Sequence, residues 1–463
     1  MIAPARAAAY EVLRAVNGPS RGREEAEPTA PLDLPSALSA ARRGLADERD
    51  RALAGEIATG TLRWQGAFDH LIAEYARRPL GRLDPEIVDI LRMGMFQLLH
   101  LTRVPASAVV DDAVQLAKRA GKRSAAPLVN AVLRRVSRER DHLPLPPRDE
   151  RQRDAALAYL AQTLSHPQWL VERWLDRYGF ADAERWCRFN NSTAALTLRA
   201  NRLRTTPERL GADLAAHGVA SRAARFAPDA LVVESGNPLA TPLAGSGAFV
   251  VQDEASQLVA LMTGVRPGER VFDACASPGG KTTAMAASMR DDGLIAAADV
   301  RPRRVRLLAE TVRRSGASII RVVHADAAAP PPFRQPFDCV LLDAPCSGLG
   351  TVRRDPDIKW RRRQEDLARS ADLQTRMLAA LADLVRLGGR LVYATCSSEP
   401  EENEAVVNRF LEARPDFTVR PPGSLPDAVR PLLDDDGCLR TSPARDGLEA
   451  FFAAPLVKAA PVR

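Results

Sequence analysis

Two cysteines of the chain follow apolar runs and lie in short turns of small residues. Cys346 occurs in DAPCSG (Asp343 to Gly348), and Cys396 occurs in ATCSS (Ala394 to Ser398). Buried cysteines at strand ends are usually inert, but two thiols in matching positions could also bond, bind a metal or react. A thiolate can attack C6 of a pyrimidine, which makes C5 nucleophilic enough to accept a methyl group. Pyrimidine methylation is therefore one reaction that the pair could support.

The spacing of the cysteines argues against structural alternatives. The six cysteines of this chain of 463 residues form no CxxC pair, so a disulfide scaffold or a zinc ribbon is not expected, and we expect no metal site. Asp343 is separated from Cys346 by two residues and could polarise the N3/N4 edge of a cytosine. A second thiol near the base could assist product release, but spacing alone does not rank the two cysteines.

The segment DACASPGGKTT, from Asp273 to Thr283, joins a predicted strand to a predicted helix. Its glycines let a ligand approach the backbone, and a helix N-terminus favours a carboxylate or phosphate. A P-loop would need glycine at the position of Cys275, which disfavours a P-loop nucleoside triphosphatase. We favour a loop that binds S-adenosylmethionine through Cys275, Ala276, Ser277, Pro278, Gly279, Gly280 and Lys281.

Carboxylates end four of the predicted strands, and ligands of parallel sheets bind at this edge. Asp299 follows Asp273 by 26 residues and suits the ribose hydroxyls of the cofactor, as an acid does in dinucleotide-binding folds. Asp326 could reach the adenine amino group, and Lys281 could pair with the cofactor carboxylate. Asp273, Asp299, Asp326 and Asp343, with the two cysteines, therefore predict one site.

The surrounding pattern predicts the elements that position this site. From about residue 247, strands at 270–276, 293–300, 319–326, 337–345 and 389–396 alternate with helices at 280–290, 301–316 and 364–387. This rhythm is typical of a mostly parallel α/β sheet covered by helices.

Three further parts precede the α/β domain. Apolar residues at helical spacing predict an all-α domain over 1–142, interrupted by a polar loop at 17–35. Residues 143–150 are proline-rich and read as a linker. Residues 151–246 mix helices with short strands and predict a small α+β module, and 247–463 form the α/β domain.

A basic stretch, 351–367, directly follows the first cysteine motif. Phosphate contacts and base stacking would explain its composition, and we expect RNA contacts from Arg353, Arg354, Lys359 and Trp360. A base must leave its stack to reach such a pocket, so a single-stranded or loop target is expected. A solvated helix start is the plainer alternative.

Composition limits the class of protein only broadly. The formal charge of +7 and the pI near 9.3 are compatible with a nucleic-acid partner, although the arginine content also fits a GC-rich genome. No run of 18 apolar residues and no signal-peptide core occur, so we expect a cytosolic protein without a membrane partner.

Together these motifs resemble the RNA cytosine-C5 methyltransferase family. The matching stretches are DACASPGGKT, DAPCSGLGTVRRDPDIKW, YATCSSEPEENE and QDEASQL (residues 252–258). The first 140 residues, with EIVDILRMGMFQLL, VPASAVVDDAVQLAK and VNAVLRR, resemble the NusB-type RNA-binding domain. This pairing is similar to the RsmB (Sun/Fmu) type, which methylates 16S ribosomal RNA.

The resemblance implies a Rossmann-like methyltransferase domain and a role for each matching residue. Cys396 would be the nucleophile and Cys346 would help to release the product. Asp343 would join the 275–281 loop, Asp299 and Asp326 in binding S-adenosylmethionine. A Pro-Cys nucleophile, as in DNA cytosine-C5 enzymes, would instead favour Cys346. The expected partner is 16S rRNA, and we expect a monomer.

Other classes of function remain open at this point. The chain could methylate transfer RNA or another RNA at cytosine C5. It could also be a non-catalytic RNA-binding or antitermination factor that uses the helical domain, although the cysteine pair disfavours this. Extra residues between Gly447 and the Phe451-Phe452 pair leave the register of the last hairpin undetermined.

Overall fold

The computed structural model describes residues 2–18, 31–329 and 333–459, which divide into two compact units. The first unit comprises the described residues of 1–193 and 352–362, and the second those of 194–351 and 363–463. The chain therefore leaves the second unit shortly after the turn that contains Cys346, and it returns at Arg363.

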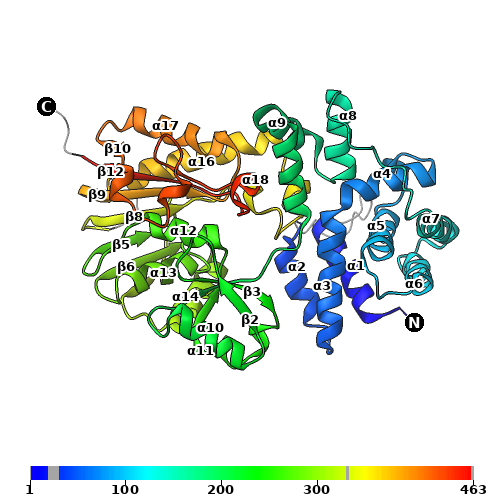
Figure 1. Cartoon of the computed structure of the whole chain (residues 1–463), viewed down its shortest axis with the longest axis horizontal. Coiled ribbons are helices and arrows are strands. Elements are labelled where there is room, and N and C mark those ends of the chain that lie inside the picture. The colour runs from blue at the N-terminus through cyan, green and yellow to red at the C-terminus, as the bar shows by residue number, and fades with distance from the viewer. Residues whose placement is uncertain (1, 19–30, 330–332, 460–463) are drawn as a thin grey trace. The chain divides into compact units, whose positions relative to one another are not determined.

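The first unit is helical, as predicted for the N-terminal part of the chain (Figure 1). Apolar side chains at helical spacing, such as Ile87, Leu91 and Met95 of α5, pack into its core. Its helices are α1 (Pro4–Asn17), α2 (Leu34–Arg42), α3 (Glu48–Arg63), α4 (Gln65–Ala76), α5 (Pro85–His100), α6 (Ala106–Arg119), α7 (Ala126–Arg138), α8 (Arg153–Ala158), α9 (Gln168–Asn191) and α15 (Ile358–Arg361).

The expected polar loop at 17–35 lies largely outside the described residues, and α2 begins at its end. Asp33 caps α2 by accepting a hydrogen bond of 2.8 Å from the main-chain N–H of Ser36. Within α9, Gly179 has a positive φ of 73° that interrupts the helix. These local signals explain where two of the helices begin or bend.

The predicted boundaries of the central module differ from the units of the structure. Helices α8 and α9 belong to the first unit, although we assigned 151–193 to the module. Ser165, just before α9, accepts a hydrogen bond of 2.8 Å from the N–H of Gly66 in α4. An amphipathic pattern shows that a helix buries one face but not what covers that face, so the sequence alone does not reveal that α8 and α9 pack within the first unit.

The small module itself is a four-stranded antiparallel sheet in the order β2-β3-β1-β4, with α10 packed on it. Its last strand pairs with β1, so the module extends to Val251 rather than 246. Its elements are β1 (Thr197–Ala200), α10 (Pro207–Ala216), β2 (Ala220–Ala223), β3 (Ala230–Ser235), α11 (Leu243–Ser246) and β4 (Phe249–Val251).

The larger sheet of the second unit has the order β10-β12-β9-β8-β5-β6-β7, with β11 paired to β12. Strands β7, β6, β5, β8 and β9 run parallel, whereas β12 and β10 run antiparallel. The strands are β5 (Arg270–Asp273), β6 (Leu294–Asp299), β7 (Ile320–His324), β8 (Phe337–Asp343), β9 (Val385–Thr395), β10 (Phe417–Val419), β11 (Leu439–Arg440) and β12 (Phe452–Lys458). The predicted mostly parallel α/β domain is therefore confirmed.

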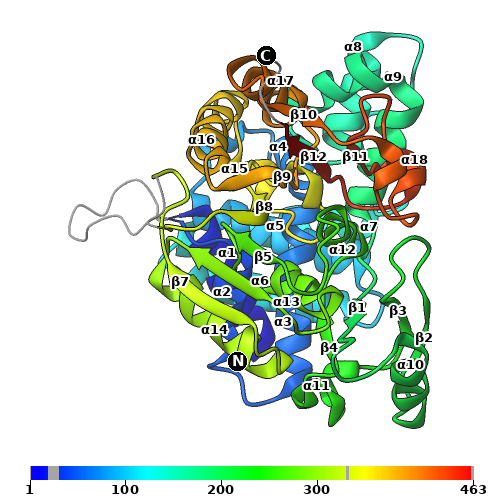
Figure 2. The ribbon, with the colours of Figure 1, turned by 90° about the vertical axis from the view of Figure 1, so that its left-hand side faces the viewer.

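Helices cover both faces of this sheet (Figures 1 and 2). Alternate residues of β8 explain this, since Cys339 and Leu341 enter one apolar core while Val340 and Leu342 enter the other. Helices α12 (Glu254–Met262), α13 (Gly280–Ser288) and α14 (Pro302–Ser315) contribute to the first core, and α16 (Gln364–Ala382) and α17 (Glu404–Ala413) to the second. The result is a three-layered Rossmann-like fold.

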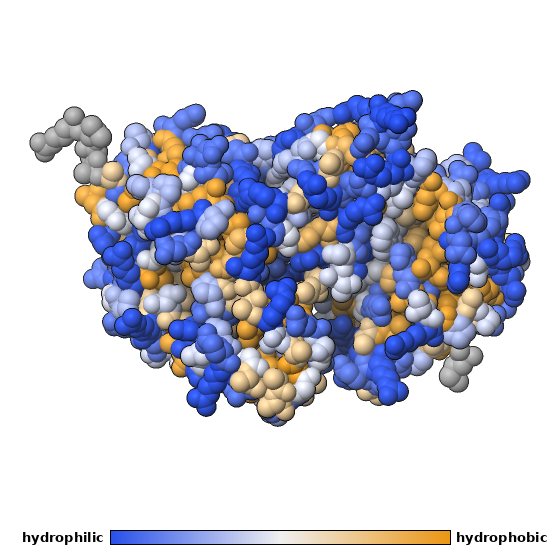
Figure 3. Space-filling view, viewed as in Figure 1, coloured by the Kyte–Doolittle hydropathy of each residue, from blue (hydrophilic) through white to orange (hydrophobic). Residues whose placement is uncertain are grey.

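The last segments of the chain add antiparallel strands to this sheet beside β9. The short helix α18 (Pro443–Asp446) follows β11, and the pairs Leu439 with Ala453 and Arg440 with Phe452 set the register of the hairpin. On the face drawn in Figure 3, hydrophilic residues predominate and apolar side chains form small patches. Within the described ranges, no helix combines the length and apolarity needed to cross a membrane.

Candidate active site

The two cysteines of the predicted pair lie next to each other. Cys346 follows β8 and Cys396 follows β9, and these neighbouring parallel strands end at the same edge of the sheet. The two Sγ atoms are 3.3 Å apart, and both cysteines are half-buried free thiols. The structure thus brings together two groups that are fifty positions apart in the chain.

Gly350 allows the two turns to approach closely. Its N–H donates to the carbonyl oxygen of Cys396 at 2.9 Å, and its own carbonyl oxygen accepts from the N–H of Ala450 at 3.0 Å. A Cβ atom at this position would lie 1.9 Å from the Ala450 oxygen. Only glycine therefore fits here, which accounts for the last residue of CSGLG.

The environments of the two thiols differ. The pKa of Cys346 is raised well above its usual value, first because its thiol shares a hydrogen bond with Cys396 and then because the thiol is buried. The nearby negative charge of Glu402 raises it further. Cys346 therefore stays a thiol and can donate a hydrogen bond to the Cys396 sulfur.

An ion pair lies at the same edge of the sheet. Nζ of Lys281, in the first turn of α13, is 2.7 Å from Oδ2 of Asp343 at the end of β8. Burial disfavours the Lys281 cation, but Asp343, and after it Cys396 and Asp273, raise the net pKa of Lys281. A fixed positive charge therefore lies close enough to Cys396 to interact with it electrostatically.

The predicted cofactor loop is a tight connection from β5 to α13. The N–H of Ala276 donates to the Ala298 oxygen at 2.8 Å, which holds the loop against the end of β6. Gly279 has a φ of 106°, and a Cβ there would come within about 3.0 Å of Leu308 and 3.1 Å of Thr311. The Ser277-Pro278 peptide is cis, and Ser277 donates to the Arg304 oxygen at 3.0 Å.

The predicted carboxylates follow four of the five parallel strands, but their environments differ. Asp273 is 1% exposed, and burial raises its pKa to about 7, which Thr282 opposes by donating to Oδ2 at 2.7 Å. Among the residues that the structure describes, none donates a hydrogen bond to Oδ1 of Asp273. Asp299 is 5% exposed and accepts from the N–H of Arg301, whereas Asp326 is exposed.

Two residues that we did not single out support the loop. Arg199 of β1 is buried, and it donates to Oε1 of Gln252 at 2.7 Å and to Oγ1 of Thr283 at 2.7 Å. Gln252 opens the QDEASQL stretch, so this motif did carry a usable signal. The guanidinium links the small module to the first turn of α13.

A buried carboxylate also joins the two cysteine turns and was not foreseen. Glu402 is 0% exposed and lies in a short 3₁₀ turn, Pro400–Glu402, before α17. Oε1 accepts from the N–H of Ser347 at 2.7 Å. Oε2 accepts from Oγ of Ser347 and from Oγ of Ser397, each at 2.5 Å. The signal was in view, because Glu402 belongs to the quoted stretch SSEPEENE.

The residues that we expected to contact RNA belong to the first unit and not all are accessible. Lys359 is 0% exposed, and its Nζ donates to the main-chain oxygens of Ser165 at 2.6 Å and Arg63 at 2.9 Å. Nε1 of Trp360 donates to the Leu62 oxygen at 2.6 Å. Both side chains are thus engaged within the protein, and the structure favours a structural role for them.

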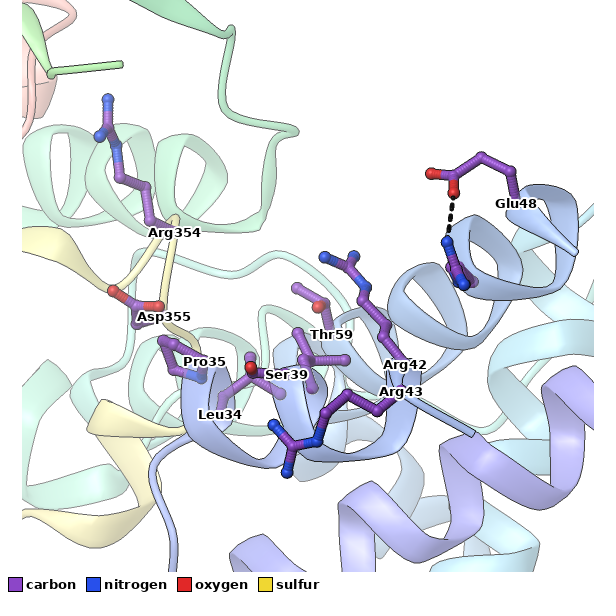
Figure 4. Close-up of a pocket in the computed structure, with 11 residues that line it drawn as sticks. Leu34, Pro35, Ser39, Arg42, Arg43, Glu48, Thr59, Arg354 and Asp355 are labelled. Atoms are coloured by element: carbon purple, nitrogen blue, oxygen red, sulfur yellow. Dashed lines mark hydrogen bonds and ion pairs between the residues drawn. The ribbon is translucent and has the colours of Figure 1, made fainter. Parts of the chain in front are cut away.

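The other two predicted RNA contacts, Arg353 and Arg354, lie nearer the surface of the same unit. The guanidinium of Arg353 stacks on Phe189 at 3.9 Å from the ring centroid. Arg354 lines a cavity of about 640 Å³ that also contains Arg42, Arg43 and Arg51 (Figure 4). The carboxylates of this cavity are Glu48 and Asp355, and Arg51 pairs with Glu48 at 3.2 Å. The lining is therefore predominantly basic.

Comparisons with known families match each part of the chain. Residues 260–457 match the family described as 16S rRNA methyltransferase RsmB/F. Residues 3–138 match the NusB family, and residues 166–240 match the ferredoxin-like domain of RsmF/B-like methyltransferases. These matches follow in order along the chain, and the ferredoxin-like match includes α9 of the first unit together with most of the small module.

Relatives resemble the chain over most of its length. A Bacillus subtilis protein described as a probable ribosomal RNA small subunit methyltransferase B is 35% identical over 89% of this chain and 91% of its own. The crystal structure of PH0851 is 27% identical, covers 99% of both chains and has a TM-score of 0.80. A methyltransferase homologue from Pyrococcus horikoshii, 27% identical with a TM-score of 0.57, covers 66% of this chain and 100% of its own.

Proposed function

Because the chain belongs to the RsmB/F family of 16S rRNA methyltransferases, we propose that it methylates C5 of a cytosine in 16S rRNA through a covalent cysteine adduct. The observation that carries this proposal is the pair of free thiols 3.3 Å apart, beside the Lys281–Asp343 ion pair. A nucleophile, a proton donor and a charged pair then meet at one edge of the sheet, where ligands of this fold bind.

Cys396 is the nucleophile in this proposal. Its thiolate attacks C6 of the cytosine, so that a bond between Sγ and C6 forms and the electrons of the C5–C6 double bond become available at C5. The Lys281 cation lies close enough to Cys396 to interact with it electrostatically, and the Cys346 thiol, which stays protonated, can donate a hydrogen bond to its sulfur. These neighbours support Cys396 over Cys346 in a way that sequence spacing did not.

In the same proposal Asp343 binds the base, and Cys346 assists release of the product. Asp343 is partly exposed, with 28% of its side chain accessible, and it can reach the N3/N4 edge of a cytosine held at Cys396. After methylation the C5 proton must leave, the C5–C6 double bond must re-form and the Sγ–C6 bond must break. Cys346, next to the leaving sulfur, is placed to assist this elimination.

The residues of the loop fit S-adenosylmethionine, which when bound supplies an electrophilic methyl group. Cys275 to Lys281 present main-chain groups at the start of α13, where a helix N-terminus favours a carboxylate. Asp273 has an unpartnered buried oxygen, and Asp299 suits ribose hydroxyls. Asp326, being exposed, is assigned to the adenine amino group, at the outer end of the cofactor.

The RNA is held by positive charge outside this site. The formal charge of +7 and the basic cavity with Arg354 suit the phosphates of an RNA strand. Arg353 adds a stacked guanidinium. Because the reacting atoms C5 and C6 must face a thiol, the target cytosine has to leave its stack, which a loop or single strand permits most readily.

Methyl transfer from labelled S-adenosylmethionine tests the proposal. Unmodified 16S rRNA should acquire 5-methylcytosine, identified by mass spectrometry of the nucleosides, whereas an unmodified transfer RNA mixture should not. A parallel assay with assembling small subunits separates naked RNA from a particle as the substrate. Absence of transfer to any RNA would refute the proposal, and transfer to tRNA alone would change its substrate.

A further inference from the structure

We propose that Glu402 is a positioning residue that holds the Cys346 and Cys396 turns at their working separation. This proposal deepens the proposed function and rests on it, because the separation matters only if both thiols act on one base. Glu402 contacts neither thiol through a hydrogen bond. It acts through the serine that follows each cysteine, Ser347 and Ser397.

The hydrogen-bond pattern assigns both turns to one carboxylate. Ser347 uses its N–H and its hydroxyl on the two Glu402 oxygens, at 2.7 and 2.5 Å. Ser397 donates its hydroxyl to the same Oε2 at 2.5 Å. The two serine oxygens are 3.2 Å apart. Each hydroxyl has only one proton, so with both donated to Glu402 the carboxylate, and not a serine–serine bond, connects the turns.

Surrounding residues fix the position of Glu402. Its carboxylate also accepts from Nε2 of Gln374 in α16 at 3.3 Å, and Gln374 in turn donates to the Pro345 oxygen at 3.0 Å. Its main-chain oxygen accepts from the hydroxyl of Tyr393. The next residue, Asn403, accepts from Oγ1 of Thr395 at 2.5 Å and donates to the Ser397 oxygen at 3.0 Å.

Burial gives these bonds their importance. Glu402 and Gln374 are 0% exposed, Ser347 is 1% exposed and Ser397 is 2% exposed. A buried carboxylate is costly unless donors satisfy its oxygens, and charge-assisted hydrogen bonds are stronger than neutral ones. The network is therefore stable only while both turns stay close to Glu402, and this requirement keeps the two thiols adjacent.

Thiol crosslinking measures the separation without RNA or cofactor. Diamide oxidises two adjacent thiols: each loses its proton, one S–S bond forms, and two electrons and two protons reduce the N=N bond of diamide. We expect wild-type protein to form the Cys346–Cys396 disulfide readily, as followed by mass spectrometry of the linked peptides. Glu402→Gln keeps the side-chain volume but loses acceptor capacity, and should slow this crosslink by about tenfold or more.

Activity assays give a second, independent readout. Glu402→Gln should lower kcat by about tenfold or more and leave KM for S-adenosylmethionine unchanged, because the cofactor loop lies elsewhere. Glu404→Gln is the matched control, since Glu404 lies two positions away and pairs with Arg440 at 2.9 Å. It should crosslink and transfer methyl groups at wild-type rates.

A milder variant keeps the test decisive if Glu402→Gln does not fold. Ser397→Ala removes one of the hydroxyl donors to Glu402. By itself it should slow the Cys346–Cys396 crosslink relative to the wild type. If Glu402→Gln does fold, adding Ser397→Ala to it should slow the crosslink little further, since both changes break the same connection. Wild-type crosslinking rates in Ser397→Ala or Glu402→Gln would overturn the proposal. If the variants crosslink slowly but the wild-type protein transfers no methyl group to any RNA, only the proposed function is refuted.

Discussion

Nζ of Lys281 lies 2.7 Å from Oδ2 of Asp343, so that one ion pair connects the loop after β5 to the end of β8. The Lys281 side chain is 12% exposed and that of Asp343 is 28% exposed. The more buried Lys281 cation therefore relies more on Asp343 to compensate its charge than the Asp343 carboxylate relies on Lys281. The pair also joins the predicted cofactor loop to the predicted base-binding aspartate.

This asymmetry predicts different effects for the two partners. Asp343→Asn leaves the Lys281 cation poorly compensated, so it should destabilise the protein by about 3 kcal/mol and reduce methyl transfer by about a hundredfold. Lys281→Met should reduce transfer similarly but cost less stability, because water can still reach Asp343. Urea unfolding and transfer kinetics measure both effects. Equal losses of stability in the two variants would contradict this account.

The order of the two thiols is tested by alanine variants. Cys396→Ala should abolish transfer, because no sulfur attacks C6. Cys346→Ala should still form the Sγ–C6 bond but release the product slowly, so a covalent RNA–protein adduct should accumulate. Denaturing gel electrophoresis with labelled RNA detects this adduct.

Two further proteins control this experiment. The double variant should form no adduct, and Cys438→Ala, which removes a buried cysteine outside the pair, should behave like the wild type. An adduct in Cys396→Ala but not in Cys346→Ala would reverse the roles that we assign to the two thiols.

Burial of Asp273 predicts a dependence of stability on pH. Its pKa is raised from 3.8 to about 7, chiefly by burial. A carboxyl with a higher pKa in the folded than in the unfolded protein binds its proton more tightly when folded, so its contribution becomes less favourable as pH rises from about 4 to about 7. Asp273→Asn removes this effect, and its stability relative to wild type should rise by about 3 kcal/mol from about pH 5 to about pH 8. Urea unfolding at both pH values checks this, and a difference independent of pH would contradict it.

The sequence was sufficient to predict the sheet and the cysteine pair for physical reasons. Apolar strands that alternate with amphipathic helices can bury both faces only in a parallel α/β sheet, and parallel strands end at one edge. Cys346 and Cys396 follow two such strands, so their proximity could be expected once these strands were neighbours. The Lys281–Asp343 pair could not be predicted, because it depends on side-chain directions at the ends of β8 and α13.

Burial was the property that sequence patterns described least well. Glu402 and Lys359 are charged residues in polar stretches, for which exposure is the ordinary expectation, yet both are 0% exposed. Their partners lie far away in the chain or on main-chain oxygens that no motif reveals. The same limitation applies to α9, because its pattern does not identify the helices against which it packs.

Lys359 provides a last prediction, on the role of the basic segment. Its Nζ donates to the main-chain oxygens of Arg63 and Ser165. Burial, and to a smaller extent the nearby charge of Arg63, lower the pKa of Lys359 well below its usual value. Lys359→Met fills the same space but leaves the two oxygens without this donor, which should cost about 1–3 kcal/mol for each. Urea unfolding at neutral pH measures this loss.

The salt dependence of RNA binding separates this structural role from a phosphate contact. Each phosphate contact that is lost lowers the slope of log K against log salt by about one. Lys359→Met should leave this slope unchanged, because no phosphate can reach a side chain that is 0% exposed. Arg354→Ala, from the basic cavity, should lower it by about one. Wild-type stability together with a lower slope in Lys359→Met would show that this lysine leaves its buried position to bind RNA.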